Sequence, residues 1–199
     1  MDLNLRSKLE ELLKTEGLDQ AIVVAENELK ALPVTRFHAI IGKNLLSLTP
    51  GLIDYVDTFY MDSTSFFEGK GKSLKAIYSE MNGFSINYDR WFIDIFSYSF
   101  IGEEGDHYWL ADYEFEAQGS YIISGFEDVQ GAFEDYMKNK RWSDKTQEAC
   151  MEICEYIVIL RLQQLFKNAC EVAKSSGKNW AGIPVFVTAH DYDFIYDCN

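Results

Sequence analysis

The spacing of hydrophobic residues changes from helical to strand-like at Phe84, and this change limits the folds that the chain can adopt. Before Phe84, apolar residues recur at the spacing of amphipathic helices. After it, the segment WFIDIFSYSF at residues 91–100 is dense in β-branched and aromatic residues, which favour strands. Helical spacing returns at residue 124. Such segregation of helices and strands predicts an α+β fold with a mainly antiparallel sheet, because a parallel sheet would need alternating strands and helices.

The expected elements follow from this pattern. Helices are expected over residues 2–16, 18–32, 35–47, 73–82 and 124–137, and one more should begin at Thr49 and Pro50. Residues 144–175 give the longest predicted helix, which is apolar almost all round near its middle, as a central helix covered on two sides would be. Strands are expected over residues 91–100, 108–117, 121–124 and 184–198. We expect one α+β domain over residues 1–199, with the helical hairpin region 1–48 as a candidate appendage.

Several classes of protein are not expected. No apolar run approaches the ~20 residues that a membrane helix needs, and the N-terminal segment lacks the basic and apolar regions of a secretory signal. Cys150 and Cys154 are four residues apart, but no His or Cys pair lies nearby in sequence to complete a metal site. We therefore expect a soluble cytoplasmic protein with reduced cysteines, no membrane association, no metal and no cofactor.

The net charge of −14 is concentrated in the middle of the chain. Residues 84–137 contain 12 acidic residues and one basic residue, Arg90, so they account for −11 of the −14. The same segment contains 15 of the 30 aromatic residues. A negative field of this kind steers basic proteins toward the chain and repels nucleic acid, so nucleic-acid binding is not expected.

The acidic residues predict a partner-binding site. If residues 109–117 form a regular strand, then Asp112, Glu114 and Glu116 lie on one side of it. Like charges at this spacing repel each other, so their face should lie in water or against a cationic group. The turn before the strand adds three carboxylates. The expected site consists of Glu103, Glu104, Asp106, Trp109, Asp112, Glu114 and Glu116. The alternatives are a solvated strand face and a divalent-cation site, although the turn lacks the spacing of a calcium loop.

Asp94 and His190 are candidates for enzyme chemistry. Asp94 has aromatic residues on both sides in its strand row, so we expect either a buried carboxylate paired with Arg90, Arg161 or a tyrosine hydroxyl, or an acid or base with a raised pKa. His190 lies in an aromatic row, which indicates a core residue with satisfied hydrogen bonds. The alternative for His190 is a site shared with Asp191 or Asp193 and with acidic residues of the middle strands. Motifs for nucleophile elbows, phosphate loops, dinucleotide folds and HExxH zinc sites are absent.

These observations favour a non-enzymatic acidic binding module that inhibits or neutralises a basic protein. One alternative is a small hydrolase or lyase with a site around Asp94 and His190. A further alternative is a structural protein that dimerises through the long helix. The sequence sets no oligomeric state.

Overall fold

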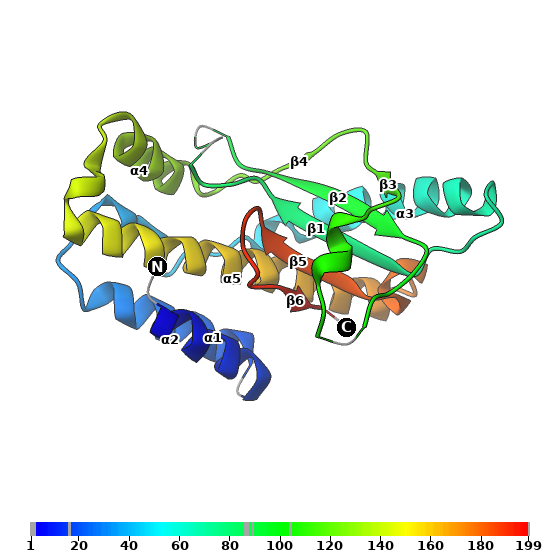
Figure 1. Ribbon diagram of the computed structural model, residues 1–199, viewed down its shortest axis with the longest axis horizontal. Coiled ribbons are helices and arrows are strands. Elements are labelled where there is room, and N and C mark those ends of the chain that lie inside the picture. The colour runs from blue at the N-terminus through cyan, green and yellow to red at the C-terminus, as the bar shows by residue number, and fades with distance from the viewer. Residues whose placement is uncertain (1–2, 16, 86–87, 89, 104, 199) are drawn as a thin grey trace.

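The described residues form a six-stranded mixed sheet with the α-helices on one face, and this arrangement confirms the predicted α+β class (Figure 1). The computed structural model describes residues 3–15, 17–85, 88, 90–103 and 105–198. Expectations that involve residues 1–2, 16, 86–87, 89, 104 and 199, including Glu104, lie outside the described residues.

In the part of the chain that the structure describes, the α-helices number five and include the predicted N-terminal hairpin and the long helix. They are α1 (Leu3–Thr15), α2 (Leu18–Lys30), α3 (Thr49–Glu68), α4 (Glu127–Lys138) and α5 (Lys145–Ser175). Asp144 begins α5 as an N-cap, because its side chain accepts hydrogen bonds from the backbone N–H groups of Thr146 and Gln147 at 3.0 and 3.2 Å. Short 3₁₀ helices are η1 (Arg36–Ile40), η2 (Leu46–Leu48), η3 (Tyr108–Ala111), η4 (Arg141–Ser143) and η5 (Asn179–Gly182).

The sheet has the strand order β3-β2-β1-β5-β6, and β4 also pairs with β2. Its strands are β1 (Ala76–Met81), β2 (Phe92–Tyr98), β3 (Phe115–Glu116), β4 (Tyr121–Ile122), β5 (Val185–Ala189) and β6 (Tyr196–Asp197). The pairing of β1 with β5 is parallel, and the other pairings are antiparallel. The expectation of a mainly antiparallel sheet is therefore confirmed.

The main hydrophobic core lies between α5 and the sheet. Ile77, Ile93 and Val187 come from three neighbouring strands and face α5. Leu18 and Leu29 of α2 belong to the same cluster, so the N-terminal hairpin closes the opposite side of α5. As predicted, α5 is covered from two sides, and within the chain its apolar middle packs on α2, α3 and β5.

Two predicted helices are wrong. Residues 73–82 contain β1 instead of a helix, because pairing with β2 and β5 overrides the helix propensity of its alanine, glutamate and methionine. Residues 35–47 form only η1 and the start of η2. Gly42 interrupts them with a positive φ of 77°, a conformation that glycine adopts without strain.

Two predicted strands are also wrong in extent. Residues 108–117 contain η3 and only a two-residue strand, so the regular alternation expected over residues 109–117 does not occur. Residues 184–198 form β5, a turn and β6 instead of one strand. Asp191 adopts a φ of 67° in that turn, which aspartate tolerates better than most residues, and the Tyr192 N–H donates to the Ala189 carbonyl at 3.1 Å.

A buried ion pair fastens the N-terminal hairpin to α5. Arg161 of α5 donates to Glu26 of α2 at 2.7 Å, and the two side chains are only 12% and 10% exposed. This pairing corrects the expectation that Arg161 would bind Asp94. Burial alone would raise the pKa of the Glu26 carboxyl, but hydrogen bonds from the Gly42 backbone and Arg161 outweigh burial and lower that pKa.

We predict that Arg161→Met lowers the free energy of unfolding by about 3 kcal/mol, because it leaves Glu26 buried without its guanidinium partner. Urea denaturation followed by circular dichroism measures the change. Lys30→Met is the control: this half-exposed lysine lies 3.6 Å from Glu26, so its loss should change stability by less than about 1 kcal/mol. Equal losses in the two variants would contradict the role given to the buried pair.

Candidate functional site: the second face of the sheet

The sheet face opposite α5, called the second face, carries an aromatic row beside a row of carboxylates. Tyr78 of β1 lies between Phe96 of β2 and Phe186 of β5 in the strand register, and the Tyr78 and Phe96 rings are 5.9 Å apart. One step along the strands, Glu80 of β1 faces Asp94 of β2. Because alternate residues of a strand share a face, these side chains are placed together by the period of two.

The 99–114 loop covers part of the second face and is anchored there by Trp109 (Figure 1). The Trp109 ring packs against Tyr98 and Phe186 at centroid distances of 4.9 and 5.6 Å. A Cβ atom on Gly102 would lie 2.1 Å from the Trp109 ring, so only glycine fits at position 102. Trp109 is 8% exposed. The tryptophan expected to contact a partner therefore lies under the loop and holds it in place.

Four of the predicted acidic site residues are exposed on this side. Glu103 lines a cavity of about 330 Å³ with Trp109 and Phe186. Asp106 accepts a hydrogen bond from the Tyr108 backbone N–H at 2.8 Å, two residues further along the chain. Among the described residues, no Lys or Arg lies within ion-pair distance of Glu103, Asp106, Asp112 or Glu116.

Glu114 differs from the other predicted site residues because it is neutralised. Its carboxylate pairs with Lys72 and accepts a hydrogen bond from the Ser99 backbone at 2.7 Å. Partial burial opposes ionisation, but these hydrogen bonds outweigh burial and lower the pKa of Glu114 to about 2. Glu114 therefore fixes the 99–114 loop to Lys72 and leaves no free charge for a partner.

Glu80 links Tyr78 to His190 at the centre of the second face. The Tyr78 hydroxyl donates to one Glu80 carboxylate oxygen at 2.7 Å, and His190 Nδ1 lies 2.6 Å from the other. The hydrogen bond to Glu80 raises the pKa of His190 against a smaller opposing effect of burial. Burial and the neighbouring Glu80 charge raise the pKa of Tyr78. The Glu80 carboxylate therefore lies between a phenol and an imidazole, with one of them on each oxygen.

The expectations for Asp94 and His190 need correction. His190 is not a core residue: its side chain is 49% exposed at the start of the β5–β6 turn. Asp94 is half-buried and accepts a hydrogen bond from the Ser120 hydroxyl at 2.5 Å, so its predicted burial and pairing with Arg161 are wrong. Glu80 lies between the strand of Asp94 and that of His190. Sequence reasoning missed Glu80 because its segment was interpreted as a helix.

Beside Glu80 lies a cavity of about 390 Å³. Tyr78, Leu110 and Ile195 contribute apolar surface to its walls. Its other lining residues are Glu80, His107, Tyr108, Ala111, Ala189, Asp191, Tyr192 and Asp193. A volume of this size suits one long side chain or a small ligand.

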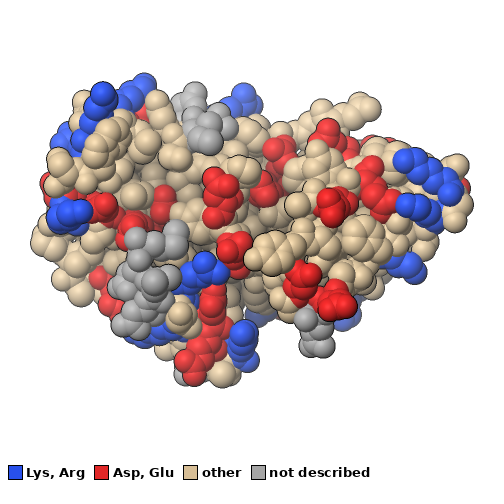
Figure 2. All heavy atoms as spheres, viewed as in Figure 1, with Lys and Arg blue, Asp and Glu red and all other residues tan. Residues whose placement is uncertain are grey.

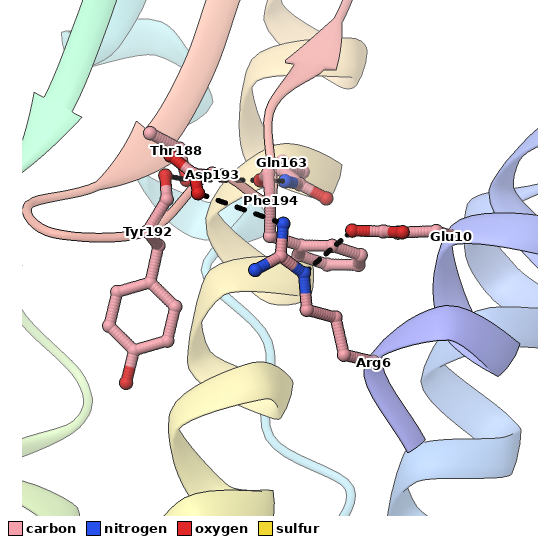
Figure 3. A network of polar contacts seen from close by, with 7 residues as sticks. All are labelled: Arg6, Glu10, Gln163, Thr188, Tyr192, Asp193 and Phe194. Carbon is pink, nitrogen blue, oxygen red and sulfur yellow. Dashed lines mark hydrogen bonds and ion pairs between the residues drawn. The ribbon is translucent and has the colours of Figure 1, made fainter. Parts of the chain in front are cut away.

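The turn that carries His190 is fixed from beneath by buried polar groups (Figure 3). Gln163 of α5 donates to the Phe194 carbonyl at 2.8 Å, and the Thr188 hydroxyl lies 3.1 and 3.0 Å from the carbonyls of Tyr192 and Phe194. The Tyr192 hydroxyl donates to Glu155 of α5 at 2.6 Å. Because these partners are buried or half-buried, the turn has a defined conformation although its outer side chains face solvent.

The carboxylates of α4, which belong to the same acidic segment of the sequence, are mostly paired. Asp128 pairs with Lys43 at 2.7 Å, and Asp135 pairs with Arg141 at 2.8 Å. Glu134 pairs with a lysine of its own helix. Figure 2 shows the second face with Asp and Glu across its middle and Lys and Arg mainly toward its ends. Glu103, Asp106, Asp112 and Glu116 therefore add exposed, unneutralised charge to the second face.

Comparisons with protein-family models, curated proteins and solved structures found no match to this chain. Within the described residues, no three His, Cys, Asp or Glu side chains are grouped so that they could hold a metal ion. In the same part of the chain, no helix combines the length and the apolar character needed to cross a bilayer.

We predict that the Glu80–His190 pair stabilises the fold in acid only. The folded-state pKa of His190 is raised, so this stabilisation is complete below the unfolded value of about 6.5 and is lost as pH rises through the folded value. His190→Gln should therefore reduce the free energy of unfolding at pH about 5.5 and have little effect at pH about 8.5. The loss stays below about 1 kcal/mol because the pair is half exposed.

Urea denaturation at both pH values measures this difference. The control is the same substitution in a Glu80→Gln background, where the effect of His190→Gln should depend less on pH, because only the weaker influence of Asp191 remains to raise the pKa of His190. An effect of His190→Gln that is larger in alkali than in acid would contradict the assignment.

Proposed function

We propose that this chain is a non-enzymatic binding protein whose second face docks a basic protein and neutralises it. The observation that carries the proposal is the separation of charge: three of the four α4 carboxylates are ion-paired, whereas Glu103, Asp106, Asp112 and Glu116 have no described cationic partner. A surface with unneutralised charge of one sign attracts a partner of the other sign and raises its association rate.

Exposed aromatic side chains on the same side support docking of a protein. Phe100, Tyr108 and Tyr113 are exposed, and Tyr108 reaches 91% exposure. Aromatic residues are enriched where protein interfaces concentrate their binding energy. Carboxylates and aromatic rings together suit a basic protein better than nucleic acid, whose phosphates the carboxylates would repel. The proposed setting is the cytoplasm, which fits the low cysteine content.

The geometry supports binding better than the hydrolase or lyase alternative. His190 has a carboxylate partner in Glu80, but its other ring nitrogen lies 3.6 Å from Asp191. Among the described residues, no Ser, Thr or Cys side chain is hydrogen-bonded to His190. A nucleophilic mechanism requires such a neighbour within hydrogen-bond reach of the base. The dimer alternative loses its basis in α5, because the apolar middle of that helix is covered within the chain.

We predict that a fluorescent octalysine peptide binds the chain and is released by about 1 M salt, where the Debye length is about 3 Å. The variant Glu103→Gln, Asp112→Asn, Glu116→Gln should weaken binding roughly tenfold, because each exposed charge contributes about 0.5 kcal/mol. Fluorescence anisotropy measures the affinity.

The matched control removes three exposed carboxylates elsewhere, through Glu11→Gln, Glu68→Gln and Glu171→Gln. Both variants have the same net charge, so only a local binding surface separates them. Equal loss of affinity in the two variants would show that peptide binding follows net charge alone and would overturn the proposed docking face.

A further inference from the structure

We propose that the cavity beside Glu80 receives an arginine side chain of the partner, an inference that rests on the proposed function and specifies its anchor. In this cavity, carboxylates and apolar surface enclose one volume of about 390 Å³. A long side chain with an apolar stem and a cationic end matches this combination, because its stem can pack while its charge stays paired.

The carboxylates of the cavity come from one strand and one turn. Glu80 lies on β1, and Asp191 and Asp193 lie in the β5–β6 turn with side chains 81% and 90% exposed. Each Glu80 oxygen already accepts one hydrogen bond, from Tyr78 or from His190. A carboxylate oxygen has two lone pairs, so Glu80 can accept further N–H donors.

An arginine of the chain itself shows that a guanidinium can lie beside this turn. Arg6 of α1 donates to Glu10 at 2.7 Å, and its outer nitrogen lies 4.0 Å from Asp193 (Figure 3). At 4.0 Å the Arg6–Asp193 contact is at the limit of an ion pair, so Asp193 remains open to a closer cation. Arg6 and Glu10 approach the β5–β6 turn from the α1 side, whereas Tyr108 and Leu110 line the cavity from the 99–114 loop.

Two aromatic side chains favour arginine over lysine. Tyr78 lines the cavity from the sheet, and the almost fully exposed Tyr108 lines it from η3. A planar guanidinium stacks on tyrosine rings and donates to several carboxylates at once, whereas a lysine ammonium is a compact and strongly hydrated charge. The cavity should therefore make the second face bind arginine more tightly than lysine, a difference that net charge alone cannot produce.

Fluorescence anisotropy with octa-arginine and octalysine peptides tests the inference. Octa-arginine should bind the wild-type chain about two- to fivefold more tightly than octalysine, the range expected of one exposed stacking contact. In Tyr108→Ala and in Asp193→Asn this preference should fall to about one. Both side chains are exposed, so their loss leaves the core intact. Tyr108→Phe keeps the ring and should keep the preference.

The variant Asp112→Asn, Glu116→Gln is the control, since it removes charge from the second face outside the cavity. It should weaken both peptides by the same factor and leave the preference for arginine unchanged. Equal binding of both peptides by the wild type, or a preference that survives in Tyr108→Ala and Asp193→Asn, would overturn the arginine site and leave the proposed function standing. If neither peptide binds, the docking face and its anchor both fail.

Discussion

Burial of α5 from two sides is the constraint on which the rest of the structure depends. Its apolar surface exceeds what one layer can cover, so α2 and α3 pack on it together with the sheet. The chain then returns from α5 through η5 into β5, which lies parallel to β1 and makes the sheet mixed. Burial also places Gln163 inside, where its amide bonds the backbone of the turn that carries His190. A helix on one face of the sheet thus positions the site on the other.

The second face receives the polar side chains because helices cover only the opposite face. Alternation along β1 sends Ile77 toward α5 and Tyr78 and Glu80 the other way. The 99–114 loop covers only part of these side chains, and its anchor Trp109 uses the apolar half of the face. Glu80 is left beside the cavity, where Tyr78 and His190 share its carboxylate. This part of the second face can carry carboxylates because neither a helix nor the 99–114 loop packs on it.

The sequence predicted elements well where local signals agree, and poorly where pairing across the sheet decides. The helix α5 was correct almost to the residue, because Asp144 provides an N-cap and Gly177 follows its end. The strand β1 was mistaken for a helix, since AIYSEM consists largely of residues that also suit helices. Only its partners β2 and β5, distant in sequence, make it a strand. The error concealed Glu80, because a helix would not have placed it beside Asp94.

Counting charge along the sequence identified the acidic segment but not the acidic surface. Whether a carboxylate is neutralised depends on bases far away in the chain: Lys43 pairs with Asp128, and Lys72 pairs with Glu114. Residues 138–199 are balanced in charge, yet they supply Asp191 and Asp193 to the second face. The surface is therefore built from several segments. Within α4, three of the four carboxylates are ion-paired, so this helix adds little to the unneutralised charge. The negative potential of the second face depends on the fold. The sheet brings these carboxylates together, whereas Lys and Arg side chains pair with carboxylates elsewhere.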